Sequence, residues 1–161
     1  MKKFAIQSVL LLIVVAMGLF FYSGGLSNTT VPFLPQSSSA REVSINNAKI
    51  KVELANTQDK RSKGLGGRQA IATDEGMLFI FDRADKYPFW MKNLNFALDF
   101  IWINGEKVVE VTENVPPPTP GAADSSLTIF SAASPIDKVL EVSAGTVNRL
   151  SIKVGDSAKL L

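Results

Sequence analysis

The sequence predicts an all-β domain, a jelly-roll-like sandwich or barrel with one or two short helices, behind an N-terminal transmembrane helix. Three observations support this prediction: apolar runs of strand length, turn residues between those runs, and one long apolar segment near the start of the chain. About seven or eight short strands can be placed after residue 40, which suits a single core and a single domain.

The first 40 residues divide into three segments. Residues 1–3 are a short basic n-region, and residues 4–22 are almost entirely apolar. A helix of that length rises by about 1.5 Å per residue and crosses the roughly 30 Å of a bilayer core. Lys2 and Lys3 favour an N-terminus inside the cell. We therefore expect a single-pass protein of the cytoplasmic membrane with its domain outside, in the periplasm or the extracellular space; secretion after signal cleavage is the alternative.

Residues 23–40 are rich in serine, threonine, asparagine and proline and predict a disordered stalk before the domain at residues 41–161. Of the 17 basic residues, Lys2 and Lys3 precede the apolar segment, so the rest of the chain carries 15 against 15 acidic residues. This balance gives no case for nucleic-acid binding. The chain has no cysteine and no histidine, which excludes thiol and imidazole chemistry. We expect no cofactor and no metal site.

The domain begins with a predicted β-hairpin and a short helix. Residues 43–45 and 48–55 alternate between apolar and polar side chains, and the Asn46-Asn47 dipeptide suits the turn between them. Residues 57–63 combine a capping Thr57 with helix formers. Glycines from Gly64 onward end this helix after one or two turns.

The centre of the domain reads as a series of strands. Residues 76–81 form a continuous apolar run of strand length, and further strands are predicted at 89–92, 96–103 and 106–115. The Asn104-Gly105 dipeptide between the last two is a strong hairpin signal.

The last part contains a long proline-rich loop, residues 116–126, followed by strands at 127–130, 138–142 and 152–154 and a helical segment at 144–150. Loops of this length in compact domains are uncommon and often functional, although a variable surface loop is the alternative.

Asp99 is the first candidate functional residue, because it is an acid within the most apolar stretch of the domain. A buried carboxylate has to pair with a cation, accept several hydrogen bonds or line a pocket. A tight connection through residues 93–96 would pair the strand at 89–92 with the strand at 97–103. Trp90, Lys92, Asp99 and Ile101 would then share one face of the hairpin. The other face would carry Phe89, Met91, Leu98, Phe100 and Trp102.

Several of these motifs together resemble the domain of unknown function 192 family. They are the helix end at Arg61-Ser62-Lys63-Gly64-Leu65, then Arg68, Asp74 to Phe81, Phe89-Trp90-Met91-Lys92-Asn93, Leu98-Asp99 and Val154-Gly155-Asp156. The resemblance spans about residues 43–156. It implies a mostly-β, jelly-roll-like domain behind a signal or anchor segment, and it implies no established activity. Many members of this family carry cysteines in the loop after an Asn-Pro-Pro-like stretch, which here is Asn114-Val115-Pro116-Pro117-Pro118. This chain has no cysteine, so a redox or disulfide role of that loop does not apply.

Three interpretations of the central motif stay open. In the first, Lys92 or Arg68 neutralises a buried Asp99, and the motif is purely structural. In the second, Trp90 forms the wall of a shallow pocket for a carbohydrate or peptide-like ligand, with polar groups from Arg68, Glu75, Lys92, Asn93 and Asp99. In the third, Glu75 and Asp99 form a hydrolytic carboxylate pair. The leading hypothesis is a non-catalytic binding or accessory module at the cell envelope.

Overall fold

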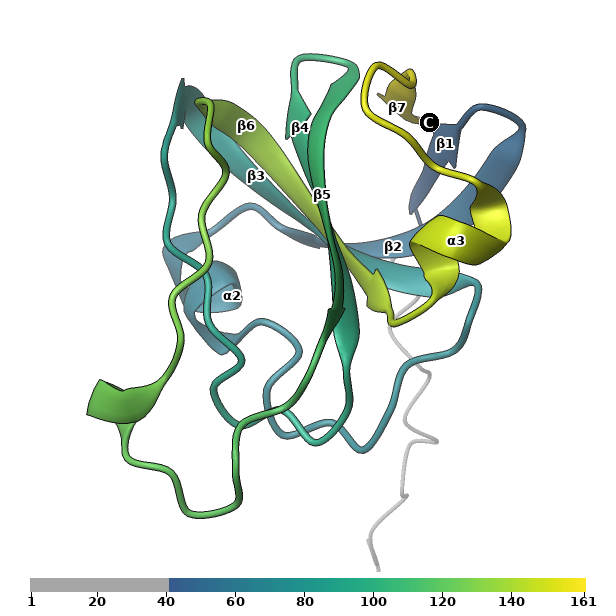
Figure 1. Ribbon diagram of the computed structural model, residues 1–161. Coiled ribbons are helices and arrows are strands. Elements are labelled where there is room, and N and C mark those ends of the chain that lie inside the picture. Colours follow the sequence, from purple (N-terminus) through teal and green to yellow (C-terminus); the bar gives the residue numbers. More distant parts are fainter. Residues whose placement is uncertain (1–40) are drawn as a thin grey trace, which may run out of the picture. The chain divides into compact units, whose positions relative to one another are not determined.

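The computed structural model describes residues 41–161 (Figure 1). The predicted n-region, transmembrane segment and stalk, residues 1–40, lie outside the described residues. Within residues 41–161, no helix is long and apolar enough to cross a membrane. The elements in chain order are β1 (Arg41–Ile45), β2 (Ala48–Ala55), α2 (Gln58–Lys63), β3 (Glu75–Asp85), β4 (Leu98–Asn104), β5 (Lys107–Val115), the 3₁₀ turn η1 (Asp124–Ser126), β6 (Ile136–Ser143), α3 (Thr146–Leu150) and β7 (Ala158–Leu160).

The strands form one seven-stranded sheet in the order β5-β4-β6-β3-β2-β1-β7. The pair β2–β3 is parallel, and every other neighbouring pair is antiparallel. The predicted mostly-β class is therefore confirmed for residues 41–161, which contain two short α-helices. The single sheet differs from a jelly-roll sandwich, which has two sheets packed face to face.

The sheet curls so that its two edges meet at one end, which gives this end a barrel-like closure. Lys107 at the start of β5 forms an antiparallel bridge with Ser157, just before β7. The Val108 amide donates to the Asp156 carbonyl at 3.0 Å, and the Gly155 amide donates to the Val108 carbonyl at 2.8 Å. These bonds satisfy edge groups that would otherwise be open to another strand.

Local sequence signals account for the first half of the fold. Asn46 adopts a positive φ of 54° in the β1–β2 turn, a conformation that asparagine tolerates better than most residues. The Thr57 side chain caps α2 by accepting a hydrogen bond from the Lys60 amide, and Gly64 ends the helix with φ 50°. The helix lies in the crossover between the parallel strands β2 and β3.

The two faces of the sheet bury two separate apolar cores. Strand alternation sends Leu98, Phe100 and Trp102 of β4 to one face and Ile101 and Ile103 to the other. The first face, which we call the outer core, also contains residues from the loops between strands: Leu65, Phe89, Met91, Leu94 and Ala132. The second face, the inner core, is covered by α3 and its flanking residues through Val147 and Ile152.

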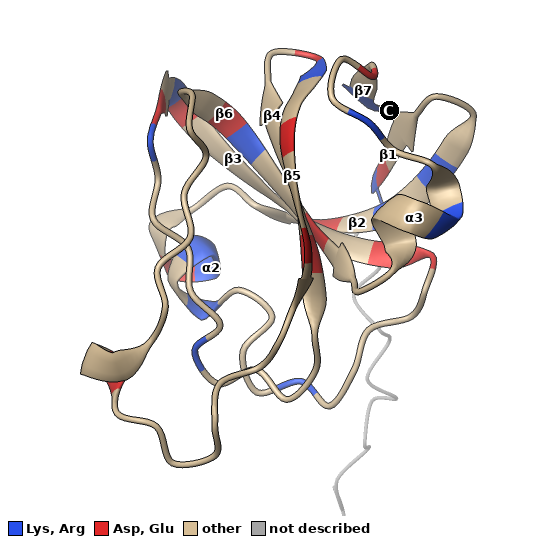
Figure 2. Cartoon of the chain, in the orientation of Figure 1, with Lys and Arg blue, Asp and Glu red and all other residues tan. Residues whose placement is uncertain are grey.

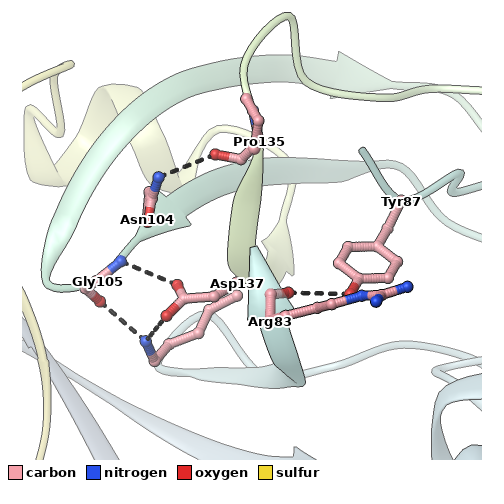
Figure 3. A network of polar contacts seen from close by, with 7 residues as sticks. Arg83, Tyr87, Asn104, Gly105, Pro135 and Asp137 are labelled. Atoms are coloured by element: carbon pink, nitrogen blue, oxygen red, sulfur yellow. Dashed lines mark hydrogen bonds and ion pairs between the residues drawn. The ribbon is translucent and has the colours of Figure 1, made fainter. Parts of the chain in front are cut away.

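The turn between β4 and β5 is fixed by polar contacts with β6 and with Pro135 just before it (Figure 3). The Gly105 amide donates to Asp137 Oδ1 at 3.0 Å, and Lys138 Nζ donates to the Gly105 carbonyl at 2.9 Å. Asn104 Nδ2 donates to the Pro135 carbonyl at 3.1 Å. Gly105 has φ 60°, so the predicted Asn-Gly hairpin is confirmed.

Three predicted strands are wrong. Residues 89–92 and 127–130 are irregular, apart from one antiparallel bridge between Phe89 and Phe130. Residues 152–154 are also irregular, and the final strand is β7, which pairs with β1. The predicted hairpin of residues 89–92 with β4 cannot form because β4 already has a neighbour on each side, β5 and β6.

Candidate functional site

A cleft with a volume of about 1060 Å³ lies over the outer core. Four parts of the chain line it: α2 and the glycine-rich turn after it, the second half of β3, the irregular segment at residues 87–94, and Glu141 of β6. Clefts of this size, lined by apolar side chains with a few polar groups, are typical of small-molecule sites.

Aromatic side chains form the walls of the cleft. The rings of Phe79 and Phe89 meet edge to face with centroids 5.1 Å apart, and those of Phe81 and Tyr87 stack at 3.6 Å. The Tyr87 hydroxyl donates to the Arg83 carbonyl at 2.9 Å and so holds the turn after β3 (Figure 3). Trp90 also lines the cleft and is 46% exposed, an unusual value for so large an apolar side chain.

The cleft lining carries more basic than acidic side chains. Arg61 lies over the Phe81 ring, 5.4 Å from its centroid, and donates from Nη1 to the Ile80 carbonyl at 3.0 Å. Lys63 and Arg83 line the cleft without an ion-pair partner among residues 41–161. The basic residues of α2 are visible as blue turns of the helix beside the sheet (Figure 2).

The backbone at the cleft is held in a close approach between two turns. The Gly67 amide donates to the Asn93 carbonyl at 2.8 Å, and Asn93 itself has φ 57°. A Cβ atom at Gly66 would lie 3.1 Å from the Lys63 carbonyl oxygen and 3.4 Å from the Lys92 carbonyl oxygen. Glycine at position 66 therefore lets the turn after α2 pack against the 92–93 turn.

Glu141 is the most unusual residue of the cleft. The residue is only 4% exposed, and its side chain has no hydrogen-bond or ion-pair partner among residues 41–161. Within residues 41–161, every side-chain oxygen that is sealed from solvent has a hydrogen-bond partner. The Glu141 carboxyl has no partner, so it is not sealed, and it contacts the space of the cleft. Its strand neighbours are Met77 and Phe100, both apolar.

Burial raises the pKa of the Glu141 carboxyl to about 8, because the charged form is poorly solvated there. At neutral pH the group is therefore mostly a neutral carboxylic acid, which can donate one hydrogen bond and accept others. A perturbed acid in a cleft is a mark of functional sites in general.

Asp99, the first candidate from the sequence, lies on the opposite face of the sheet and is fully buried. Its Oδ1 accepts from the Asn114 amide at 2.8 Å, and its Oδ2 accepts from the Val147 amide at 2.9 Å. Val147 is in the first turn of α3, whose N-cap, Gly145, has no side chain to cap it. Asp99 is therefore a structural cap supplied by β4, and its predicted pairing with Lys92 or Arg68 is wrong.

Arg68 and Glu75 lie in a different groove, which is lined mainly by residues of β2 and β3. Arg68 makes a bidentate ion pair with Glu53 of β2, with distances of 2.6 and 2.9 Å. The hydrogen bond from Arg68 lowers the pKa of the Glu53 carboxyl. Glu75 is exposed in this groove, whereas Asp99 is buried on the other face, so the hydrolytic pair considered from the sequence does not assemble.

Of the six candidates from the sequence, the structure brings Trp90, Lys92 and Asn93 together in the aromatic cleft. Lys92 forms an ion pair with Asp124 of η1, which ties the cleft to the long proline-rich loop. Sequence analysis missed Glu141, although it carries the same signal as Asp99: a lone acid within the apolar run Val139-Leu140-Glu141-Val142. No group of three acidic residues suited to a metal ion occurs within residues 41–161.

Comparison with known proteins agrees with the resemblance found in the sequence. A model of the DUF192 family, described as uncharacterized ACR, matches residues 41–160. The chain belongs to this family. No curated protein matches the sequence.

Two crystal structures resemble this DUF192 chain. One is a protein of Sinorhizobium meliloti 1021 described as a candidate transcription regulator, with 32% identity and a TM-score of 0.67 over 75% of this chain and 94% of that one. The other is a protein of unknown function from Novosphingobium aromaticivorans DSM 12444, with 31% identity and a TM-score of 0.66 over 73% of this chain and 83% of that one. The matched domain makes up nearly all of the first crystallised chain, so the domain of that protein folds without a large partner domain in the same chain.

Proposed function

We propose that the DUF192 domain of this chain is a non-catalytic binding module whose ligand site is the aromatic cleft. We also propose that residues 4–22 tether it to the outer side of the cytoplasmic membrane, as a binding or accessory protein of the cell envelope. The ligand is a flat molecule with polar groups, of the carbohydrate or peptide-like kind that aromatic walls and directional polar groups suit.

The observation that carries this proposal is the unpartnered carboxyl of Glu141 on the floor of the cleft. Burying a polar group without a partner costs free energy, and an apolar residue at this position would be better for the stability of the fold. A ligand that bonds to the carboxyl and covers the aromatic walls removes that cost. The six residues singled out in the sequence contribute three members, Trp90, Lys92 and Asn93, to this site.

The burial of the central motif does not favour the interpretation in which this motif is purely structural. It requires Trp90, Lys92 and Asp99 to be buried together, but only Asp99 is buried, while Trp90 is half exposed and Lys92 pairs with an exposed acid. Asp99 alone serves the fold.

The two tryptophans of the chain provide the test. Trp90 lines the cleft, whereas Trp102 is fully buried in the outer core and donates from Nε1 to Thr112 Oγ1 at 2.9 Å. A ¹⁵N-labelled protein of residues 41–161 would be titrated with N-acetylglucosamine, glycylphenylalanine and indole in separate NMR experiments. We expect at least one probe to move the Trp90 indole signal and the Gly66 and Asn93 amides, with the Trp102 signal unchanged.

The proposal fails if all three probes leave the Trp90 indole signal in place, or if the shifted amides gather around Asp99 and α3 instead. The tether is tested separately. Full-length protein should stay with the membrane fraction after washing with sodium carbonate, and residues 41–161 alone should not; recovery of the full chain in the wash would contradict the anchor.

A further inference from the structure

The charges and hydrogen-bonding groups of the aromatic cleft select one chemical class of ligand, and this inference rests on the proposed binding function. We infer that the cleft takes a small amphipathic anion: an apolar body with a neutral hydrogen-bond acceptor that faces Glu141 and a carboxylate that lies among the basic side chains of the lining.

The first argument is the hydrogen-bonding capacity left open at the floor of the cleft. Glu141 is the most deeply buried acid of this cleft, and none of its neighbours on β3 and β4 can bond to its side chain, because Met77 and Phe100 are apolar. As a neutral carboxylic acid it presents an O–H donor. A ligand carbonyl satisfies this donor, whereas burying a ligand carboxylate beside it would carry the large cost of an unpaired charge.

The second argument is the charge of the lining. The exposed acid of the cleft is Asp82, and the basic side chains are Arg61, Lys63, Arg83 and Lys92. Lys92 is neutralised by Asp124, which leaves an excess of positive charge over the lining acids. An excess of this kind favours an anionic ligand and accelerates its association.

The third argument is the aromatic wall between these two polar regions. Phe79, Phe81, Phe89 and Trp90 offer ring faces and edges that pack against a flat apolar body. An ammonium ligand would also suit aromatic rings. The cations of the lining and the neutral state of Glu141 oppose it.

The effect of pH follows from the groups that face the cleft. Besides Glu141 these are Arg61 and Lys63 from α2, Asp82 and Arg83 from β3, and Tyr87 and Lys92 from the 87–94 segment. None of them forms a hydrogen bond or ion pair with the Glu141 carboxyl. Because an acceptor needs the protonated carboxyl, the acceptor's contribution to affinity is lost as the pH rises through and above about 8, the pKa of the Glu141 carboxyl.

Three probes of similar shape separate the possibilities. 4-Acetylbenzoate has an acceptor and a carboxylate, 4-isopropylbenzoate lacks the acceptor, and 4′-(aminomethyl)acetophenone carries a cation in place of the carboxylate. Each would be titrated into residues 41–161, with the Trp90 indole signal giving the dissociation constant. At pH 6.5 we expect 4-acetylbenzoate to bind about fivefold more tightly than 4-isopropylbenzoate, the ratio that one net hydrogen bond provides. The cationic probe should bind about tenfold more weakly or worse.

Variants assign the two ends of the ligand. Glu141→Gln keeps a neutral donor, so the preference for the acetyl probe should remain and become independent of pH up to 9.5; Glu141→Leu should abolish the preference at every pH. The double variant Lys63→Gln with Arg83→Gln should weaken both benzoates by a similar factor. Lys159→Gln, an exposed lysine of β7 outside the cleft, is the matched control and should leave both affinities unchanged.

The outcomes separate this inference from the proposed function. Tighter binding of the cationic probe, with affinity that rises above pH 8, would overturn the anion class and leave the cleft as a binding site. Equal affinity for the two benzoates at pH 6.5 would overturn the role of Glu141 as donor. Specific binding has a dissociation constant well below about 10 mM. If none of the probes moves the Trp90 signal at this concentration, both the ligand class and the proposed site are wrong.

Discussion

The most direct test of the buried acid needs no ligand, because the Glu141 carboxyl should make the stability of the domain depend on pH. Its pKa is about 8 in the folded protein and near the ordinary glutamate value of 4.5 in the unfolded chain. Between these two values the folded state holds a proton that the unfolded state has lost. The free energy of unfolding therefore falls as the pH rises through this interval.

The size of the effect follows from the interval. Each pH unit removes about 1.4 kcal/mol, so the full interval corresponds to a loss of at most about 5 kcal/mol. We expect a measured loss of about 3 to 5 kcal/mol, since relaxation and water entry reduce the ideal value. This is a large part of the stability of an ordinary domain, roughly 5 to 15 kcal/mol.

The assay compares the wild type with Glu141→Gln, which keeps the shape of the side chain and cannot ionise. Urea unfolding of residues 41–161 would be followed by circular dichroism between pH 5 and pH 9. The two proteins should have similar free energies of unfolding near pH 5, and Glu141→Gln should be more stable by about 3 to 5 kcal/mol near pH 9. Other titrating groups cancel in the difference between the two proteins.

A matched control is Glu106→Gln, which removes an exposed acid with a side chain 68% accessible. We expect it to change the free energy of unfolding by less than about 0.5 kcal/mol at either pH. A difference between wild type and Glu141→Gln that is the same at pH 5 and pH 9 would refute the reasoning, because Glu141 would then not be a buried neutral acid.

Further predictions concern the framework of the site and would all be measured by urea unfolding at pH 7. Asp99→Asn puts an N–H donor against a backbone amide and loses one charge-assisted hydrogen bond. We expect the free energy of unfolding to fall by about 3 kcal/mol. An unchanged urea midpoint would show that Asp99 does not cap α3. Gly76→Ala places a Cβ 2.6 Å from the Glu141 carbonyl oxygen in the middle of the sheet and should cost about 3 kcal/mol; a neutral result would mean that the β3–β6 spacing is looser than described. Lys92→Gln breaks the exposed ion pair with Asp124 and should cost less than about 1 kcal/mol; a loss of several kcal/mol would indicate that this pair holds the long loop.

The features that the sequence alone predicted are those that depend on neighbouring residues. Turn chemistry located the hairpins at Asn46-Asn47 and Asn104-Gly105, and Thr57 located the start of α2. Strand alternation grouped Phe89, Met91, Leu98, Phe100 and Trp102 on one face, and all five lie in the outer core. These inferences succeed because side-chain direction and turn conformation follow from the local backbone.

Pairing between distant segments was decided only by the tertiary structure. The strand at residues 89–92 looked like the partner of β4, but both edges of β4 are taken by β5 and β6, and Phe89 instead pairs with Phe130. The local sequence does not specify which of several compatible strands pairs with each edge of β4. The register and the choice of neighbouring strand therefore depend on the tertiary structure.

The same limit applies to the two buried acids, which are alike in sequence: each is a lone carboxylate in an apolar run. Asp99 is satisfied by backbone amides 15 and 48 residues away in the chain, whereas the Glu141 side chain has no partner among residues 41–161. The difference arises from what packs on each face of the sheet, α3 on one and the aromatic cleft on the other. The sequence therefore identified Asp99 as an acid that needs a partner and missed Glu141, and only the fold decided which of the two has a partner among residues 41–161.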